Sequence, residues 1–282
     1  MQYELVLADP AKNITVFVLN QVENRTQAAR LLLGIPGLKA EQVGFVIPPQ
    51  RSQGLWRLEM MGGEFCANAA RSFGLFVART LGCSGTVEIP VSISGMPDPL
   101  SVKVTVATGN AEVAIPTPLA QDSLLLGLAP ELPAVSFPVY CFPGIIHVIA
   151  SGISPGNRGK ALFYTIKAQL ERTGSFPQAL GVLFYDPKEA RMTPAVYVYA
   201  TDSLVFESSC GSGSAAVGAW LTEGLWEGEG LFPLAQPGGV IAVRVRKHQG
   251  AIQGIWIGGP VYLGERQIID LTPRIDKSNP LS

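Results

Sequence analysis

The sequence predicts an α+β fold of two pseudo-symmetric halves, each a strand-rich sheet or barrel wrapped around one long central helix, with a functional cleft between them. Three observations lead to this prediction. The chain has 282 residues, and at about 150 residues per domain this length suggests two units. One segment with a helical pattern occurs twice, 144 residues apart. Alternating, strand-like runs precede and follow both copies.

The repeated segment is the strongest internal similarity in the chain. Residues 62–82 read GGEFCANAARSFGLFVARTLG and residues 205–225 read VFESSCGSGSAAVGAWLTEGL, with Cys66 aligned on Cys210. Small and apolar residues follow each cysteine at the spacing i, i+4, i+7 and i+11, which is typical of the buried face of a helix. They are Cys66, Ala70, Phe73 and Val77 in the first copy and Cys210, Ser214, Val217 and Leu221 in the second. We therefore expect each cysteine in the first turn of a long helix.

Strands are expected on both sides of each helix, in a similar order. Alternating residues predict a hairpin at the start of each half, over 3–19 and 138–151. Further strands are predicted over 43–48 and 55–61 and over 182–187 and 195–206, and after the helices over 87–93, 100–107, 240–246 and 252–258. Prolines between 120 and 137 predict a connector. The halves are therefore assigned to 1–125 and 126–264, with the C-terminal tail 265–282 as a candidate addition to the first half.

Composition excludes several classes of protein. The formal net charge of −1 leaves no broad positive surface for nucleic acid. The basic cluster of Arg244, Arg246, Lys247 and His248 alternates as the solvated face of a strand does. No uninterrupted apolar run of about 18 residues predicts a membrane span. The start MQYELVLADP lacks the pattern of a secretory signal, so a cytoplasmic protein is expected.

The four cysteines and two histidines limit the chemistry further. Thiols in the cytoplasm are reduced, and four of them in a chain of this length do not form a disulfide framework. Neither C-x-x-C nor H-x-x-x-H spacing occurs. The sequence therefore predicts no metal site.

A twofold arrangement of the halves would bring the two helix N-termini together. Free backbone N–H groups and positive dipole ends favour an anion there and lower the pKa of a thiol. A carboxylate with one thiol on each side suits removal of the α-proton on one face and its return on the other. The N–H donors would stabilise the carbanion-like transition state. The alternative interpretation is that Cys66 and Cys210 are small, buried core residues.

The two cysteine segments resemble the active-site motifs of the diaminopimelate epimerase fold family of cofactor-independent amino-acid racemases. The residues that carry the resemblance are EFCANAAR at 64–71 and FESSCGSGSA at 206–215, with DPAKN, EQVGF, GIIHVI and QPGG at 9–13, 41–45, 144–149 and 236–239. Among members, the chain is most similar to the histidine racemases that supply D-histidine for opine-type metallophores. The resemblance implies a cofactor-independent isomerase with an amino acid as its small-molecule substrate and no nucleic-acid or membrane partner. Whether the chain forms a homodimer stays open.

The resemblance also implies a role for each matched residue. Cys66 and Cys210 would be the base and acid pair, Glu207 would hold the α-ammonium, and His147 would support a cysteine or the substrate. Four backbone N–H groups would hold the α-carboxylate, and three further side chains would line the substrate: these are Ala67, Asn68, Gly211 and Ser212 for the carboxylate and Asn13, Glu41 and Gln42 for the lining. Other interpretations stay open, with Asn13 as a turn residue, His147 as a core residue and Glu41 as a surface charge.

The chain departs from the epimerase pattern in both motifs. The epimerase has an arginine directly after the motif glutamate, where it binds the far carboxylate of the substrate, and this chain has Ser208. Loss of that charge-assisted anchor favours a substrate with a neutral or imidazole side chain. Ala67 and Ala69 replace glycines of the first motif. The alternatives are diaminopimelate epimerase, proline racemase or hydroxyproline epimerase, a phenazine-pathway type of isomerase, and a non-catalytic binding protein of the same fold.

Overall fold

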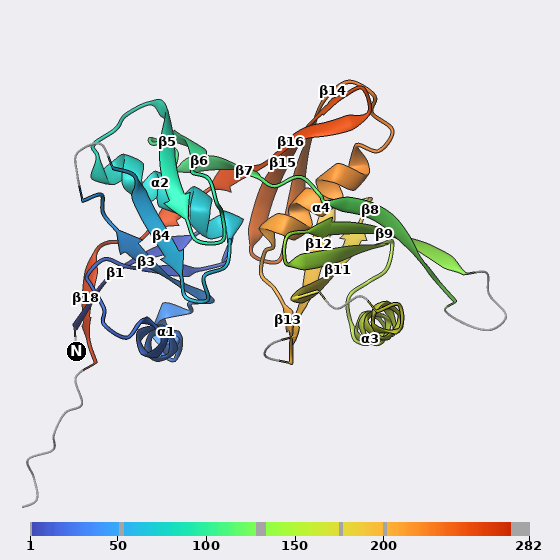
Figure 1. The fold of residues 1–282 in the computed structure, drawn as a ribbon, viewed down its shortest axis with the longest axis horizontal. Coiled ribbons are helices and arrows are strands. Elements are labelled where there is room, and N and C mark those ends of the chain that lie inside the picture. The colour runs from blue at the N-terminus through green and yellow to red at the C-terminus, as the bar shows by residue number, and fades with distance from the viewer. Residues whose placement is uncertain (1, 51–53, 128–133, 175–176, 200–201, 272–282) are drawn as a thin grey trace, which may run out of the picture.

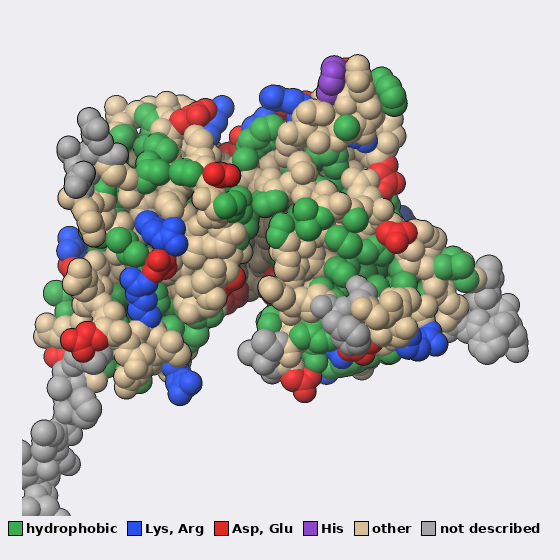
Figure 2. Space-filling model, in the orientation of Figure 1, with side chains coloured by type: hydrophobic (Ala, Val, Ile, Leu, Met, Phe, Trp, Pro, Cys, Tyr) green, Lys and Arg blue, Asp and Glu red, His purple; other side chains and the backbone are tan. Residues whose placement is uncertain are grey.

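The computed structural model describes residues 2–50, 54–127, 134–174, 177–199 and 202–271. These residues form a strand-rich α+β fold with one 18-stranded mixed sheet, so the predicted fold class is confirmed at this level. The ribbon divides into two lobes that lie side by side, with α2 in one lobe and α4 in the other (Figure 1). The space-filling view is notched between the two lobes (Figure 2).

The first part of the chain follows the predicted order of strands and adds one outer helix. The elements of the first lobe are β1 (Gln2–Asp9), β2 (Thr15–Val18), α1 (Arg25–Leu33), the 3-10 turn η1 (Pro36–Leu38), β3 (Gln42–Ile47), β4 (Trp56–Met60), α2 (Ala67–Thr80), β5 (Thr86–Ile93), β6 (Leu100–Thr105) and β7 (Asn110–Ile115).

The second part contains a similar series. Its elements are β8 (Ala120–Leu126), β9 (Val135–Phe142), β10 (Ile145–Ser151), α3 (Asn157–Arg172), β11 (Ala179–Asp186), β12 (Arg191–Val198), β13 (Ser203–Phe206), α4 (Gly211–Leu221), β14 (Gly228–Gln236), β15 (Gly239–His248) and β16 (Ala251–Pro260), followed by β17 (Tyr262–Leu263) and β18 (Gln267–Asp270).

The same succession of strand pairings occurs twice. In the first lobe β1–β2 is antiparallel, β2–β3 parallel, β3–β4 antiparallel, β4–β5 parallel, and β5–β6 and β6–β7 antiparallel. In the second lobe β9–β10, β10–β11, β11–β12, β12–β14, β14–β15 and β15–β16 repeat this order of directions. The repeat seen in the sequence therefore extends to the hydrogen-bonding pattern of the sheet.

Equivalent glycines let α2 and α4 pack closely on their sheets. A Cβ atom at Gly74 would overlap Val102 on β6, and one at Gly218 would overlap Val243 on β15. The face that each helix turns to the sheet is buried, including Phe73 in α2. None of the helices in the described ranges combines the length and the apolar character that a membrane-spanning helix needs.

Two antiparallel contacts connect the lobes. β16 pairs with β7 from Ile255–Ile115 to Pro260–Asn110. The chain then returns to the first lobe, where β17 and β18 both pair with β1. Residues 272–282 of the expected C-terminal tail lie outside the described residues.

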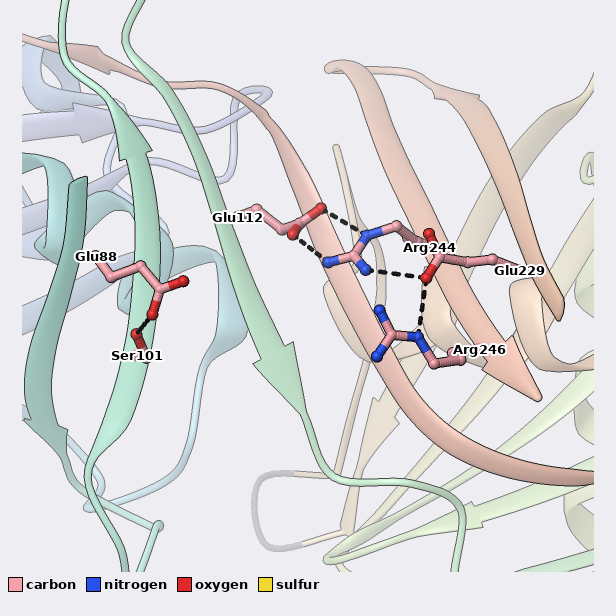
Figure 3. A network of polar contacts seen from close by, with 6 residues as sticks. All are labelled: Glu88, Ser101, Glu112, Glu229, Arg244 and Arg246. Carbon is pink, nitrogen blue, oxygen red and sulfur yellow. Dashed lines mark hydrogen bonds and ion pairs between the residues drawn. The ribbon is translucent and has the colours of Figure 1, made fainter. Parts of the chain in front are cut away.

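A polar cluster crosses the junction of the lobes (Figure 3). Arg244 on β15 contacts Glu112 on β7 through two hydrogen bonds, Nη2 to Oε1 at 2.5 Å and Nε to Oε2 at 3.3 Å. Glu229 on β14 accepts from Arg244 and Arg246 at 3.3 and 3.0 Å. The Arg244 guanidinium also lies 4.1 Å from the centre of the Trp256 ring. The cluster therefore links three strands of the second lobe to one strand of the first.

Three features differ from the sequence-based expectation. The helices α1 and α3 were not predicted, because much of each is exposed and only a narrow stripe of each is buried. Part of the predicted connector, Ala120–Leu126, forms β8, because pairing with β9 satisfies its backbone groups. Lys247 was predicted on a solvated face and is buried, because it shares the inner face of β15 with Val245.

Candidate active site

Both cysteines occupy the residue directly before a helix. Cys66 is the N-cap of α2 with φ −125° and ψ 112°, and Cys210 is the N-cap of α4 with φ −129° and ψ 116°. The Cys66 Sγ accepts a hydrogen bond from the Ala69 N–H at 3.5 Å. The two sulfur atoms therefore leave the backbone from nearly identical local geometry, at the end of a helix where backbone N–H groups are free.

The two helix N-termini converge. A Cβ atom at Gly211 would lie 3.3 Å from Ala67 Cβ and 3.9 Å from the Asn68 backbone nitrogen. The Asn68 Nδ2 also donates to Ser209 Oγ, the residue before Cys210, at 3.3 Å. Since both helices direct their positive ends to this point, the arrangement favours a bound anion there.

Asn13 is the centre of a hydrogen-bond network beside Cys66. Its Oδ1 accepts from Gln42 Nε2 at 3.1 Å and from Asn68 Nδ2 at 3.2 Å, and it lies 3.9 Å from Cys66 Sγ. Its Nδ2 donates to Glu41 Oε2 at 2.7 Å. The structure thus brings together Asn13, Glu41, Gln42, Asn68 and Cys66, which the sequence had assigned to one site.

The loop before Asn13 contacts the second lobe. Ala11 and Lys12 have positive φ angles of 66° and 59°, which non-glycine residues seldom adopt. A Cβ atom at Gly238 would overlap the Ala11 carbonyl oxygen, and the Gly238 N–H donates to the Ser208 carbonyl at 2.8 Å. The motifs at 9–13 and 236–239 are therefore adjacent in space, and glycine is required where they meet.

His147 is linked to Cys210 through Ser212. The His147 Nε2 and Ser212 Oγ are 2.9 Å apart, and Ser212 Oγ is 3.6 Å from Cys210 Sγ. Gly181, opposite His147 in the parallel β10–β11 pair, leaves room for the imidazole. Burial lowers the pKa of His147 to about 3, so the ring is neutral at physiological pH. Its Nδ1 is buried without a hydrogen-bond partner among the described residues.

Gln236 also positions the second cysteine, and sequence reasoning did not assign it to the site. Its Oε1 accepts from the Cys210 backbone N–H at 2.8 Å, and its Nε2 donates to Ser214 Oγ at 2.9 Å. The signal was present in the sequence, because Gln236 opens the QPGG motif, but the motif alone does not reveal this contact.

Glu207 is half-buried beside Cys210. Burial raises its pKa to about 7, the hydrogen bond with Cys210 opposes this shift, and the charge of Glu41 adds to it. Glu41 belongs to the first lobe, so carboxylates from both lobes lie near one another at the site. Two such groups provide a place for a cationic part of a ligand.

The environment of the thiols differs from the sequence-based expectation. Burial raises the pKa of the Cys66 thiol to about 11 and that of Cys210 well above its ordinary value. The expected effect of the helix N-termini is present, because backbone N–H groups oppose both shifts, but loss of solvation outweighs it. Cys83 and Cys141 are half-buried elsewhere, after α2 and in β9.

Other parts of the described chain are less suited to catalysis. No group of three or more His, Cys, Asp or Glu residues in it is arranged to hold a metal ion. A surface hollow of about 530 Å³ lies over β6, β7, β15 and β16, and its lining includes Glu112, Arg244 and Gly259 but none of the predicted site residues. The guanidinium of Arg244 in this hollow is already paired with Glu112 and Glu229.

A comparison with protein families matches almost the whole chain. The family described as the histidine racemase CntK N-terminal domain matches residues 2–266. The chain belongs to this histidine racemase family. It is an isomerase, an amino-acid racemase or epimerase, and the resemblance seen in the sequence is confirmed.

Relatives of known name match over most of their length. A histidine racemase of Fusobacterium nucleatum subsp. nucleatum is 27% identical over 267 residues, which are 92% of this chain and 93% of the relative. A histidine racemase of Staphylococcus aureus is 24% identical over 251 residues, 86% of this chain and 88% of the relative.

Solved structures share the fold at low sequence identity. A hydroxyproline epimerase from Agrobacterium vitis matches with a TM-score of 0.62 and 12% identity, covering 96% of this chain and 93% of that one. A methylitaconate-delta-isomerase matches with a TM-score of 0.58 and 10% identity, covering 95% of both chains. These likenesses concern the fold alone, which serves more than one reaction.

Proposed function

We propose that this racemase interconverts L- and D-histidine without a cofactor, with Cys66 and Cys210 as base and acid on opposite faces of Cα. The observation that carries the proposal is the convergence of two cysteine-capped helix N-termini, in which Gly211 lies against Ala67 and Asn68. A carboxylate bound at this point would have one sulfur atom on each side.

The proposal includes the architecture around the site. Each lobe is one copy of a duplicated unit, a sheet wrapped around a central helix, and the substrate lies in the cleft between the copies. The repeated order of strand pairings and the equivalent glycines Gly74 and Gly218 support a duplication. In this proposal the first copy comprises β1 to β7 with the returning strands β17 and β18, and the second comprises β8 to β16, so the division falls a few residues before the predicted one at 125.

The proposed reaction is a proton transfer through the substrate. One cysteine, as thiolate, removes the Cα proton, and the electron pair of the broken bond is delocalised onto the α-carboxylate. The other cysteine, as thiol, donates its proton to the opposite face, which inverts the centre. Backbone N–H groups of Ala67, Asn68, Gly211 and Ser212 stabilise the charge where it develops.

The remaining residues bind and orient the amino acid in this proposal. Glu207 holds the α-ammonium, while Asn13, Glu41 and Gln42 line the side-chain end. His147 acts through Ser212, which orients its hydroxyl toward Cys210.

Histidine is the proposed substrate for two reasons. The relatives that match over most of the chain are named histidine racemases. Ser208 also stands where a diaminopimelate epimerase has an arginine for the second carboxylate, and the hydroxyl of Ser208 has no charge to bind that group.

Hydrogen exchange in deuterium oxide tests the function directly. The reduced enzyme with L-histidine should incorporate deuterium at Cα and abolish optical rotation, while meso-diaminopimelate and L-proline should not exchange. Cys66→Ser and Cys210→Ser should each lower racemisation by at least about 100-fold. Cys83→Ser is the matched control and should retain activity. Absence of exchange with every amino acid, or normal racemisation by either site variant, would refute the proposal.

A further inference from the structure

Arg71 is a buried cation next to the candidate active site and takes no part in the proposed proton transfer. It lies in the second turn of α2 and is 0% exposed. Its Nη1 donates to the Gly259 and Pro260 carbonyls at 3.0 and 3.3 Å, where β16 pairs with β7 at the junction of the lobes. Its Nε donates to Asn68 Oδ1 at 3.1 Å. The guanidinium therefore connects the lobe junction to a residue of the site.

Arg71 has only hydrogen-bond donors, and this property fixes the orientation of Asn68. A side-chain amide has an acceptor oxygen on one side and a donor NH2 group on the other. Because Arg71 can only donate, it holds the amide oxygen of Asn68, and the NH2 group must face away from it. The Asn68 Nδ2 accordingly donates to Asn13 Oδ1 at 3.2 Å and to Ser209 Oγ at 3.3 Å. Since Ser209 belongs to the second lobe, one oriented amide contacts both lobes.

The same direction continues through Asn13 to a carboxylate. Asn13 accepts at Oδ1 and donates from Nδ2 to Glu41 Oε2 at 2.7 Å. An ionised carboxylate has only acceptors, so Glu41 binds the NH2 group of Asn13. A donor-only group at one end and an acceptor-only group at the other leave the two intervening amides a single orientation. This amide relay consists of Arg71, Asn68, Asn13 and Glu41.

The direction of the amide relay decides which group of Asn13 faces the first cysteine. The Asn13 Oδ1 lies 3.9 Å from Cys66 Sγ and also accepts from Gln42 Nε2 at 3.1 Å. In the reversed orientation, Asn13 would turn its NH2 group toward the sulfur and the Gln42 donor. Its oxygen would then lie against the Glu41 carboxylate, where two acceptors repel. The arrangement around Cys66 therefore depends on the relay keeping one direction.

The equivalent position of the internal repeat holds an alanine. At the offset of 144 residues that aligns the two cysteines, Arg71 corresponds to Ala215 and Asn68 to Ser212. Ala215 is as fully buried as Arg71, at 0% exposure. Packing of the second helix on its sheet thus needs no guanidinium at this position. A buried charge is unfavourable without polar partners, so its presence in the first lobe indicates a local role for Arg71.

We propose that Arg71 is a positioning residue that fixes the orientation of the Asn68 amide and thereby sets the direction of the amide relay. This inference rests on the proposed function, in which the relay surrounds the substrate. Without Arg71 the Asn68 amide can reverse, and its oxygen would then repel that of Asn13. Asn13 in the first lobe and Ser209 in the second would both lose their donor.

Neutron diffraction from crystals of the perdeuterated, unmodified enzyme tests the direction itself. Deuterium distinguishes an ND2 group from an oxygen atom, so the map gives the orientation of each amide. We expect the ND2 group of Asn68 to face Asn13 and that of Asn13 to face Glu41. An Asn68 oxygen that faces Asn13 would overturn the inference, whatever the activity of the enzyme.

Variants of Arg71 test the cause. Arg71→Met removes every donor and should lower kcat/KM for histidine racemisation by about 10- to 100-fold, because small displacements of positioned groups have effects of this size. Arg71→Lys keeps a donor-only group and should lower it by less than about fivefold. Arg79→Met removes an exposed arginine from the last turn of the same helix and should retain full activity. Circular dichroism verifies folding of each variant.

A double-mutant cycle separates this role from a merely structural one. Asn68→Ala removes the amide on which Arg71 acts. In that background Arg71→Met should lower kcat/KM by less than about threefold further, because residues that act through one another are not additive. Urea denaturation should show a similar loss of stability from Arg71→Met in both backgrounds. A structural arginine would lower activity by the same factor in both, and that result would overturn the inference.

The outcomes separate this inference from the proposed function. If no amino acid exchanges its Cα proton, the function fails, while the neutron map still decides the direction of the amide relay. A folded Arg71→Met enzyme with unchanged kcat/KM overturns the inference and leaves the function intact. If Arg71→Met does not fold, the neutron map and the activity of Arg71→Lys decide the question. A folded Arg71→Lys enzyme that loses about 100-fold or more would then count against a donor-only requirement.

Discussion

Glycine at residue 181 controls the placement of His147. The parallel β10–β11 register sets these two residues opposite each other, and the imidazole occupies the space where a side chain at 181 would lie. A Cβ atom at residue 181 would overlap His147 Nδ1, so the fully buried imidazole would have to move. The link from His147 through Ser212 to Cys210 therefore depends on the absence of a Cβ atom.

Gly181→Ala should lower kcat/KM for racemisation by about 100-fold, because a displacement of about 1 Å in a positioned group has an effect of this size. The comparison is Gly254→Ala on β16, where the three atoms nearest to the added Cβ belong to the Trp256 ring, outside the candidate active site. That variant should retain activity. Steady-state racemisation assays measure both, and a fully active Gly181→Ala enzyme would contradict the role given to His147.

Glu207 makes stability depend on pH. Burial raises its pKa from 4.5 to about 7, so the folded chain holds a proton that the unfolded chain has released between these values. Its contribution should lower the free energy of unfolding as the pH rises from 4.5 to about 7. Urea denaturation at several pH values should show that the free energy of unfolding decreases less over this pH range in Glu207→Gln than in the unmodified chain.

Glu227→Gln provides the control for this pH dependence. Glu227 is exposed, and its hydrogen bond with His248 lowers its pKa, so its contribution to stability has the opposite sign. The decrease in the free energy of unfolding between pH 4.5 and 7 should therefore persist in Glu227→Gln. An identical pH profile for Glu207→Gln and the unmodified chain would show that burial does not perturb Glu207.

At the scale of elements, α4 is fixed at both ends. Its N-terminus meets α2 at the candidate active site. At its C-terminus the buried Lys247 donates from Nζ to the carbonyls of Thr222 and Glu223 at 2.9 and 3.4 Å. A cation at this end donates to the terminal carbonyl groups and interacts favourably with the helix dipole.

Lys247→Met should reduce the free energy of unfolding by about 1–3 kcal/mol, because it removes the charge-assisted hydrogen bonds to the Thr222 and Glu223 carbonyls. The exposed Lys188→Met is the control, and its change should stay within about 0.5 kcal/mol. Chemical denaturation followed by circular dichroism measures both. Equal stability of the two variants would mean that Lys247 does not anchor the helix.

At the scale of the whole molecule, the lobes are held together by strand pairing and by the Arg244 cluster. The pairing of β16 with β7 crosses the junction, and Arg244 spans from β15 to Glu112 on β7. Both partners are about three-quarters shielded from solvent, with side-chain exposures of 23% and 27%. A bidentate pair in such a position contributes more than a solvated one.

Arg244→Ala should lower the free energy of unfolding by about 1–2 kcal/mol, with a smaller effect at high salt. Arg191→Ala removes an arginine whose pair with Glu189 is more than half exposed, with exposures of 59% and 63%. Its effect should stay below about 0.5 kcal/mol. A double-mutant cycle with Glu112→Ala isolates the pair, and a coupling energy near zero would contradict the assigned link.

Local sequence patterns predicted most strands and the two cysteine-capped helices. Their apolar residues recur at the period of the element they form, and this local signal survives in the fold. Through motif resemblance the sequence also assigned Asn13, Glu41, Gln42 and Asn68 to the same site as Cys66. It did not predict α1 and α3, whose stability comes from packing one narrow face on a sheet.

The electrostatics of the site depend on tertiary packing. Residues far apart in the sequence remove water from Cys66 and Cys210, and this desolvation raises both pKa values against the effect of the helix N-termini. The same packing buries Arg71 beneath the carbonyls of Gly259 and Pro260. A residue's charge can be read from its letter, but its solvation depends on which distant segments cover it.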